Sequence, residues 1–290
     1  EFEEYISASG YPSSGWEFVV YQNGQYAYTE EPNTYQGIFT GAGYDYQANN
    51  YYQYTVSFPV IQSGNVYYVP TIESTSDIKV LSQSSSSVTF EITGNAYNGK
   101  TIIEVSYTPY YGLTINANFG GSVSWSLFSG SVYGSTSGTV SQGSSQTIYI
   151  TSGTEIQLTD NPASGYSFTS WSTSGSASYA WLYWSTSNPV VVTLSGGSGS
   201  VSANYKYTYK WTITGLYSGD QATLYVGSNS YTVTNGKTVS VTLTSTGVSW
   251  SASTSNNGAN PNPPSGTVNG PGSTTINYEY SLTITSFTVK

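Results

Sequence analysis

Carboxylates are the side chains of this sequence that offer the most chemistry, because Cys, His, Met and Arg are all absent. A thiol nucleophile, a histidine base and a His/Cys metal site therefore lack their residues. Two carboxylates held close together could still catalyse acid hydrolysis. The adjacent pair Glu30 and Glu31 precedes Pro32, however, which is typical of a solvated turn. We therefore expect no enzyme, and a secreted acid hydrolase is only the third alternative.

A Lys–Asn pair offers a second kind of chemistry, a covalent isopeptide cross-link. Lys210 and Asn277 are predicted on the first and last strands of one module, where they could lie side by side. The bond would release ammonia and would need a neighbouring carboxyl group to catalyse it. Glu279 is the candidate, because alternate residues of a strand face the same side.

Aromatic side chains make up 16% of the chain. One set that includes three tryptophans lies in the middle of the sequence and consists of Trp171, Tyr179, Trp181, Tyr183 and Trp184. These side chains could belong to a sandwich core, to an interface between subunits, or to a surface on which a glycan stacks. Core burial is the favoured interpretation, and glycan binding is the least favoured.

Charged residues are scarce, at 7% of the chain against roughly 25% in an ordinary soluble domain. The net charge is −9 and only six residues are cationic, so the sequence predicts no nucleic-acid partner. The aspartates are far apart in sequence, so we expect no metal site, and nothing indicates a cofactor; they are Asp45, Asp77, Asp160 and Asp220. A chain with so few titrating groups suits a strongly acidic environment.

Alternation of apolar and polar residues, interrupted by Gly, Asn, Ser and Pro, recurs along the whole chain. Segments 87–92, 146–150 and 238–243 follow this period of two, which is typical of half-buried strands. The predicted fold class is all-β, with Ig-like or β-sandwich modules in a linear array. Asn235-Gly236 lies between two such segments and predicts a hairpin turn.

A repeated Tyr-rich junction divides the chain. Segments 105–115, 203–213 and 276–284 read alike, since each closes one module and runs almost directly into the first strand of the next. The predicted modules are therefore residues 1–112, 113–207 and 208–280, followed by an unpaired strand at 281–290. These short connections predict a stiff array.

The segment after Tyr280 opens a module that the sequence does not complete. Its apolar side chains alternate with polar ones and are Leu282, Ile284, Phe287 and Val289, with a phase slip at Thr285-Ser286 that is consistent with a bulge. A lone strand has unpaired backbone groups and an exposed apolar face. It could fold back on the third module, be the cut end of a longer protein, or insert as a donor strand into another subunit. An alternative donor strand lies at the start of the chain, with the side chains Phe2, Tyr5 and Ile6.

Two resemblances to known families follow from these modules. In the second module, residues 153–171 (GTEIQLTDNPASGYSFTSW), with 188–194 and 200–205, resemble the divergent internalin-B-type β-repeat of bacterial and archaeal surface proteins, over about 138–207. In the third, residues 211–216 and 264–270 are similar to small Ig-like modules of secreted archaeal proteins, including filament subunits of thermoacidophiles. These resemblances imply an extracellular structural role and carry no catalytic residue onto this chain.

We therefore expect a secreted, non-enzymatic subunit of an extracellular filament or surface lattice, assembled from identical copies by strand donation. No apolar run approaches the ~20 residues that span a bilayer. The sequence starts at Glu1 without a basic–apolar signal segment, which predicts a processed chain or an expressed fragment. The alternative function is a cell-surface adhesin or glycan-binding module.

Overall fold

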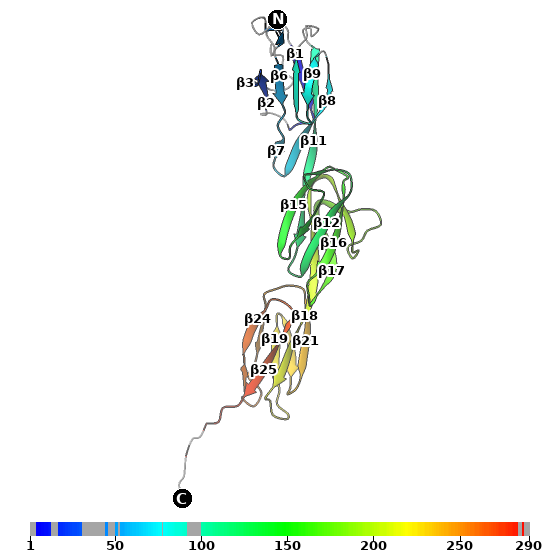
Figure 1. Ribbon diagram of the computed structural model, residues 1–290. Helices are drawn as coiled ribbons and strands as arrows, with labels where there is room; N and C mark the ends of the chain where they lie inside the picture. Colours follow the sequence, from blue (N-terminus) through cyan, green and yellow to red (C-terminus); the bar gives the residue numbers. More distant parts are fainter. Residues whose placement is uncertain are drawn as a thin grey trace.

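The computed structural model describes residues 4–12, 17–30, 44–45, 50–51, 53–76, 78–91, 100–283 and 286. Throughout these residues the chain forms strands joined by turns and no helix, which confirms the all-β fold class. None of them therefore belongs to a helix that could cross a bilayer. Figure 1 shows three β modules that follow one another along the chain, from the N-terminal end to the C-terminal end.

The first module contains two main sheets and one two-stranded sheet. One main sheet has the order β3-β2-β6-β10-β9, β4 and β5 form the small sheet, and β1, β11, β8 and β7 pair in the second main sheet. The strands are β1 (Glu4–Ser9), β2 (Phe18–Gln22), β3 (Gln25–Glu30), β4 (Tyr44–Asp45), β5 (Asn50–Tyr51), β6 (Gln53–Ser57), β7 (Ile61–Ser63), β8 (Val66–Thr75), β9 (Lys79–Gln83), β10 (Ser87–Glu91) and β11 (Lys100–Ala117).

The second module begins with the last part of β11, which pairs with β15 and with β18. β16 lies between β12 and the start of β18, and β17 runs antiparallel to β18 over most of its length. The strands are β12 (Gly121–Ser129), β13 (Val132–Tyr133), β14 (Ser137–Val140), β15 (Ser144–Ile150), β16 (Glu155–Pro162), β17 (Tyr166–Tyr179) and β18 (Val190–Thr214).

The third module begins with the last part of β18, which lies between β21 and β25. A separate sheet of order β20-β19-β22-β24 completes the module, and β23 pairs with β25. The strands are β19 (Ala222–Val226), β20 (Asn229–Val233), β21 (Thr238–Leu243), β22 (Val248–Ala252), β23 (Asn260–Asn262), β24 (Ser265–Val268) and β25 (Gly272–Glu279).

Two long strands connect the modules. β11 has 18 residues and β18 has 25, and each closes one module and opens the next. In every module the first strand pairs in parallel with the closing strand: β1 with β11, β11 with β18, and β18 with β25. Pairing through the long strands links 14 strands into one continuous sheet.

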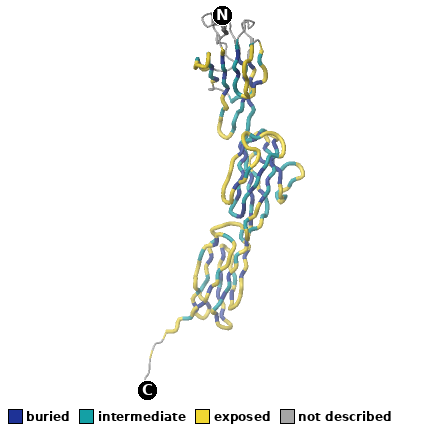
Figure 2. Tube along the Cα trace, in the orientation of Figure 1, coloured by how far each residue is buried: buried dark blue, intermediate teal, exposed yellow. Residues whose placement is uncertain are grey.

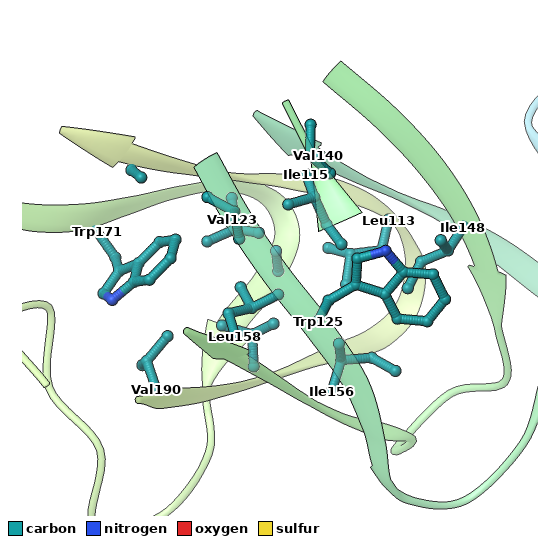
Figure 3. Close-up of a cluster of buried hydrophobic side chains, with 14 of the residues drawn as sticks. Leu113, Ile115, Val123, Trp125, Val140, Ile148, Ile156, Leu158, Trp171 and Val190 are labelled. Atoms are coloured by element: carbon teal, nitrogen blue, oxygen red, sulfur yellow. The ribbon is translucent and has the colours of Figure 1, made fainter. Parts of the chain in front are cut away.

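Each module has its own cluster of buried side chains, within residues 6–107, 113–205 and 207–278. These clusters appear in Figure 2 as dark blue segments inside each module. In the second module, alternation along β12 and β16 turns Val123, Trp125 and Leu158 inward. Figure 3 shows these side chains together with Trp171 in the core.

Two Asn-Gly turns show what this dipeptide does and does not predict. Asn23-Gly24 closes the hairpin between β2 and β3, with φ angles of 47° and 77° that Asn and Gly tolerate. The predicted hairpin at Asn235-Gly236 is wrong, because β20 pairs with β19 whereas β21 pairs with β18. This turn therefore connects the two sheets of the third module, and Gly236 still has a φ of 78°.

Neighbouring residues on β19 provide a test of the third core. Leu224 is 0% exposed, whereas Tyr225 is 46% exposed on the opposite face. We expect Leu224→Ala to lower the free energy of unfolding of this module by about 2–5 kcal/mol, since it leaves a cavity. Tyr225→Ala should cost much less. Hydrogen exchange of peptides from residues 208–280 measures the difference, and equal effects of the two changes would contradict the assigned faces.

Candidate functional site

Four tyrosines connect the first and second modules. Tyr67 and Tyr110 belong to β8 and β11, and Tyr133 and Tyr149 belong to β13 and β15. The ring centroid of Tyr67 lies 4.4 Å from that of Tyr149 and 5.5 Å from that of Tyr133, and the Tyr110 and Tyr133 centroids are 5.9 Å apart. Such pairs contribute about 0.5–1.5 kcal/mol beyond their buried area. The cluster therefore stabilises one relative orientation of the two modules.

Hydrogen bonds hold the same joint at the backbone. The N–H of Gly112, on β11, donates to the carbonyl oxygen of Asn65 at 3.1 Å and to the hydroxyl oxygen of Ser198 at 3.2 Å. The Ser198 hydroxyl in turn donates to the Asn65 carbonyl at 3.2 Å. A Cβ at position 112 would lie 3.2 Å from the Thr147 methyl group, so the close approach favours glycine here.

Tyr207 is the centre of the joint between the second and third modules. Its side chain is 2% exposed. The rings of Phe119 and Tyr166, from the second module, lie at centroid distances of 6.1 and 5.5 Å. Its hydroxyl donates to the carbonyl oxygen of Ser245, in the third module, at 2.8 Å. One tyrosine therefore contacts both modules: its ring lies against Phe119 and Tyr166 of the second module and belongs to the buried cluster of the third, to which its hydroxyl also bonds.

The far end of the third module carries a related aromatic pair. Tyr280 stacks on Tyr217 with a centroid distance of 4.1 Å and an interplanar angle of 14°. The Tyr280 hydroxyl donates to the carboxylate of Asp220 and accepts from the Tyr217 N–H at 3.0 Å. The Asn257 amide donates to the other carboxylate oxygen. Asp220 is 3% exposed and fixes this pair, while the Tyr217 side chain is 67% exposed.

The chain leaves the third module after Tyr280. Residues 281–283 form no strand, and Leu282 is 88% exposed. This part therefore does not fold back as an edge strand on the third module, and Figure 2 shows it as an exposed extension. The remaining predicted donor residues, Ile284, Phe287 and Val289, lie outside the described residues.

The alternative donor strand has a place within its own module. Ile6 is 1% exposed in the first core, and Tyr5 lies on β1, which pairs with β11. Phe2 lies outside the described residues. The sequence signal that suggested donation, a short apolar strand at one end of the chain, is satisfied here by pairing within the module.

The aromatic set divides into buried and exposed members. Trp171 is 2% exposed, and its indole N–H donates to the carbonyl oxygen of Ser187 at 2.8 Å. Tyr179 and Tyr183 are half-buried against the second core, whereas Trp181 and Trp184 are 86% and 72% exposed. Trp181 and Trp184 are exposed because β17 ends at Tyr179. The residues that follow form a loop and no longer alternate between the two faces of a sheet.

Of the three residues of the suggested cross-link, Lys210 lies far from Asn277 and Glu279. The parallel register of β18 and β25 places Lys210 opposite Ser273, and Asn277 opposite Thr214. Four residues of strand therefore separate the lysine from the asparagine, about 13 Å along the sheet. The Asn277 amide donates to Glu279 at 3.4 Å, so only these two side chains are neighbours. The suggested isopeptide bond is wrong for this register.

Asp160 is a buried carboxyl group that the sequence analysis did not single out as a site. Its side chain is 4% exposed, and one carboxylate oxygen accepts a hydrogen bond from the Tyr205 hydroxyl. The other oxygen has no hydrogen-bond partner among the described residues. Burial raises the pKa of Asp160, and the hydrogen bond from Tyr205 lowers it in part. Burial and the neighbouring Asp160 also raise the pKa of the Tyr205 hydroxyl.

A sequence signal for Asp160 existed. It follows Ile156 and Leu158 at a spacing of two on β16, so the alternation of the strand turns all three side chains to the same, inward face. Within the described part of the chain, no group of three or more Asp and Glu side chains could hold a metal ion.

Asp160 predicts an unusual dependence of stability on pH. A pKa that is raised in the folded state means that folding favours the protonated carboxyl, so the contribution of this group is fully favourable at low pH and is lost as pH rises through the folded pKa. We expect the wild type to gain stability relative to Asp160→Asn between pH 7 and pH 3 in denaturant titrations. Tyr205→Phe should enlarge the gain, because it removes the bond that lowers the pKa. An identical pH profile for wild type and Asp160→Asn would contradict this.

The register of the third module predicts the mass of the chain. Because Lys210 lies opposite Ser273 and not beside Asn277, no ammonia should be lost between these residues. Intact-mass spectrometry of the purified protein should give the mass expected from the sequence. A mass lower by one ammonia, with a cross-linked peptide that contains Lys210 and Asn277, would show that the register is wrong.

Comparison with known proteins extends the resemblance of the second module. The divergent InlB B-repeat domain matches residues 128–209, which confirms the resemblance seen over 138–207. No curated protein shows significant similarity to this sequence. The family match therefore covers the second module and leaves the rest of the chain unassigned.

Similar solved structures are bacterial proteins, among them components of pili, and none supports an archaeal source. The Bacillus anthracis TIE protein is 9% identical with a TM-score of 0.28; the match covers 96% of this chain, which spans half (50%) of that protein. The Streptococcus pyogenes major pilin T-13 is 14% identical with a TM-score of 0.22, over 70% of this chain and 96% of the pilin. A C-terminal fragment of the Lactobacillus rhamnosus pilus adhesin SpaC is 12% identical with a TM-score of 0.23, over 70% and 96%. These are loose likenesses among β-rich proteins, and they carry no function to this chain.

Proposed function

We propose that this protein is a non-enzymatic structural subunit of an extracellular filament or surface lattice, which joins identical subunits head to tail by strand donation. The observation that carries the proposal is the 88% exposure of Leu282 directly after the closing strand of the third module. An apolar side chain so exposed, at the start of an alternating apolar segment, favours pairing with another chain.

The two joints within the chain show how a strand that follows a closing strand is paired. At each of them a closing strand continues into the first strand of the next module, and that first strand pairs in parallel with the next closing strand. Residues 282–285 (LTIT) repeat the sequence that opens the second module, 113–116 (LTIN), and the third, 211–214 (WTIT). We infer that the segment after Tyr280 is a first strand whose closing strand belongs to another subunit.

The donated strand contributes affinity in two ways. Its backbone supplies ladder hydrogen bonds, and its four apolar side chains, Leu282, Ile284, Phe287 and Val289, fill an inward-facing row of the accepting module. We propose that a β-bulge at Thr285-Ser286 brings the two pairs to the same face of the strand. Burying four such side chains at about 1.5–3 kcal/mol each would stabilise the joint by roughly 6–12 kcal/mol before the entropy cost of association.

The composition supports a role outside the cell under harsh conditions. With 7% charged residues and neither Cys nor Met, the chain has few groups that protonation or oxidation can change. We therefore extend the proposal to a strongly acidic habitat.

An adhesin is the second candidate function, and one observation favours it. Trp181, Leu182 and Trp184 are 86%, 77% and 72% exposed in the loop that joins β17 to β18. Exposed indole rings stack on apolar faces of sugars and other ligands. An adhesin of this kind would bind through this loop and would remain a monomer.

Removal of the donor segment tests the proposed assembly. We expect the full chain to form linear particles in negative-stain microscopy, and a chain that ends at Tyr280 to remain monomeric. A synthetic peptide of residues 281–290 should then bind the shortened chain one to one. Leu282→Ser combined with Ile284→Ser should weaken assembly strongly, because the donated strand then loses two of the apolar side chains that it would bury.

Thr283→Ser is the matched control, since it changes the polar face of the same segment and should assemble like the wild type. Two monomeric chains, with and without residues 281–290, would refute strand donation and favour the adhesin. Assembly of the shortened chain would show that the subunits join through another surface.

A further inference from the structure

We propose that residues 118–121, which join β11 to β12, form a lid over the buried carboxyl group of Asp160, and that ionisation of this carboxyl opens the lid and loosens the joint between the second and third modules. The array is then stiffest in acid and more flexible near neutral pH. The inference concerns a single chain, so it does not depend on the assembly proposed above.

The carboxyl group of Asp160 is buried without enough hydrogen-bond donors for its charged form. Its side chain is 4% exposed, and one oxygen accepts from the Tyr205 hydroxyl while the other has no partner among the described residues. An ionised carboxylate can accept several hydrogen bonds, and it loses most of its hydration at such a site. The neutral acid avoids most of that cost, so the closed structure fits the protonated form better.

The groups that face Asp160 supply no compensating charge. On β18 the facing group is the Tyr205 hydroxyl, and on β12 the residue opposite Asp160 is Val123. The neutral side chain of Asn188, from the loop before β18, bonds to the backbone N–H and carbonyl oxygen of Asp160 at 2.9 and 3.2 Å. Lys206 follows Tyr205 in the strand, so it points to the other face of β18, where it is exposed. Hydration is therefore the remaining way to stabilise the carboxylate.

Residues 118–121 cover this site closely, and none of them titrates. A Cβ on Gly120 would lie 2.2 Å from the Tyr205 ring, and a Cβ on Gly121 would lie 2.9 Å from the Tyr205 hydroxyl oxygen. Glycine allows the backbone to approach so closely. The Gly120 carbonyl oxygen accepts a hydrogen bond from the Ala163 N–H at 2.8 Å, which holds the segment in place. Movement of this segment is therefore the most direct route by which water reaches the buried pair.

The lid also carries an aromatic residue of the joint. The ring centroid of Phe119 lies 6.4 Å from that of Tyr205, 5.9 Å from that of Tyr166 and 6.1 Å from that of Tyr207. Phe119 packs against the buried clusters of both the second and the third modules. A hollow of about 340 Å³ beside Phe119 gives the segment room to move. Opening of the lid therefore removes an aromatic contact that holds Tyr207 in the joint.

The linkage between ionisation and opening sets the direction of the effect. Burial raises the pKa of Asp160 in the closed structure, whereas hydration in the open structure returns this pKa toward its ordinary value. The closed structure therefore binds the proton more tightly. It is favoured fully at low pH, and this advantage is lost as the pH rises through the pKa of the closed structure.

Spin labels placed across each joint test the effect on the array. The chain has no cysteine, so pairs of labelled cysteines can be introduced at exposed positions. Ser178→Cys with Ser230→Cys spans the second joint, and Gln83→Cys with Ser178→Cys spans the first joint as a control. Labelled full chains are diluted with unlabelled chains, so that distances between copies do not contribute. We expect the distance distribution across the second joint to be broader at about pH 8 than at about pH 3, and the distribution across the first joint to stay the same.

Asp160→Asn is the matched variant, because its side chain is neutral at both pH values. It should keep the narrow distribution across the second joint throughout. Amide hydrogen exchange of residues 118–121 should be several-fold faster in the wild type than in Asp160→Asn at about pH 8, and equal at about pH 3. Tyr205→Phe should enlarge the difference between the two pH values, because it removes the hydroxyl that bonds to the carboxylate.

Equal distributions for the wild type at the two pH values, or equal broadening at both joints, would overturn the proposal. Broadening of the second joint in Asp160→Asn would also overturn it, since another group would then be the one that titrates. Faster exchange of residues 118–121 with an unchanged second joint would overturn the link between the lid and the joint.

Discussion

The hydrogen-bond ladders that continue across both module joints along β11 and β18 are the constraint on which the rest of the structure depends. Tyr111, on β11, lies opposite Val66 in the first module and opposite Ile150 in the second. Tyr207, on β18, lies opposite Tyr166 in the second module and opposite Leu243 in the third. The same residue therefore serves the sheets of two modules, so bending at a joint would break ladder bonds on both sides.

Tyrosine suits such joints because one side chain offers a large apolar ring and a hydroxyl. At the second joint the ring of Tyr207 packs against Phe119 of the second module and within the core of the third, and its hydroxyl bonds to Ser245 of the third. Burial raises the pKa of Tyr207, so the hydroxyl keeps its proton. The carboxyl of Asp160 is favoured in its protonated form for the same reason. Joints and cores therefore rest on groups that are neutral in acid, which agrees with the scarcity of charge in the sequence.

The sequence predicted the strands and the module junctions, because these follow from alternation and from a repeated segment. It did not predict the features that depend on pairing between strands distant in sequence. Alternation along segments such as 238–243 predicts strands, and the Tyr-rich junctions indicate where one module leads into the next. Asn235-Gly236 correctly predicted a turn, but it did not predict which strands the flanking segments pair with. Similarly, alternation placed Asn277 and Glu279 on one face, but no local signal fixed the register that separates Lys210 from them.

The proposed filament extends this construction beyond one chain, with the segment after Tyr280 as the next shared strand. Electron cryomicroscopy of the assembled full chain tests that claim most directly. The account predicts density for residues 282–289 as a strand within a sheet of the neighbouring copy, parallel to a closing strand of that copy. Density for the same residues packed against their own third module, or subunits that contact one another only through the sides of the modules, would contradict it.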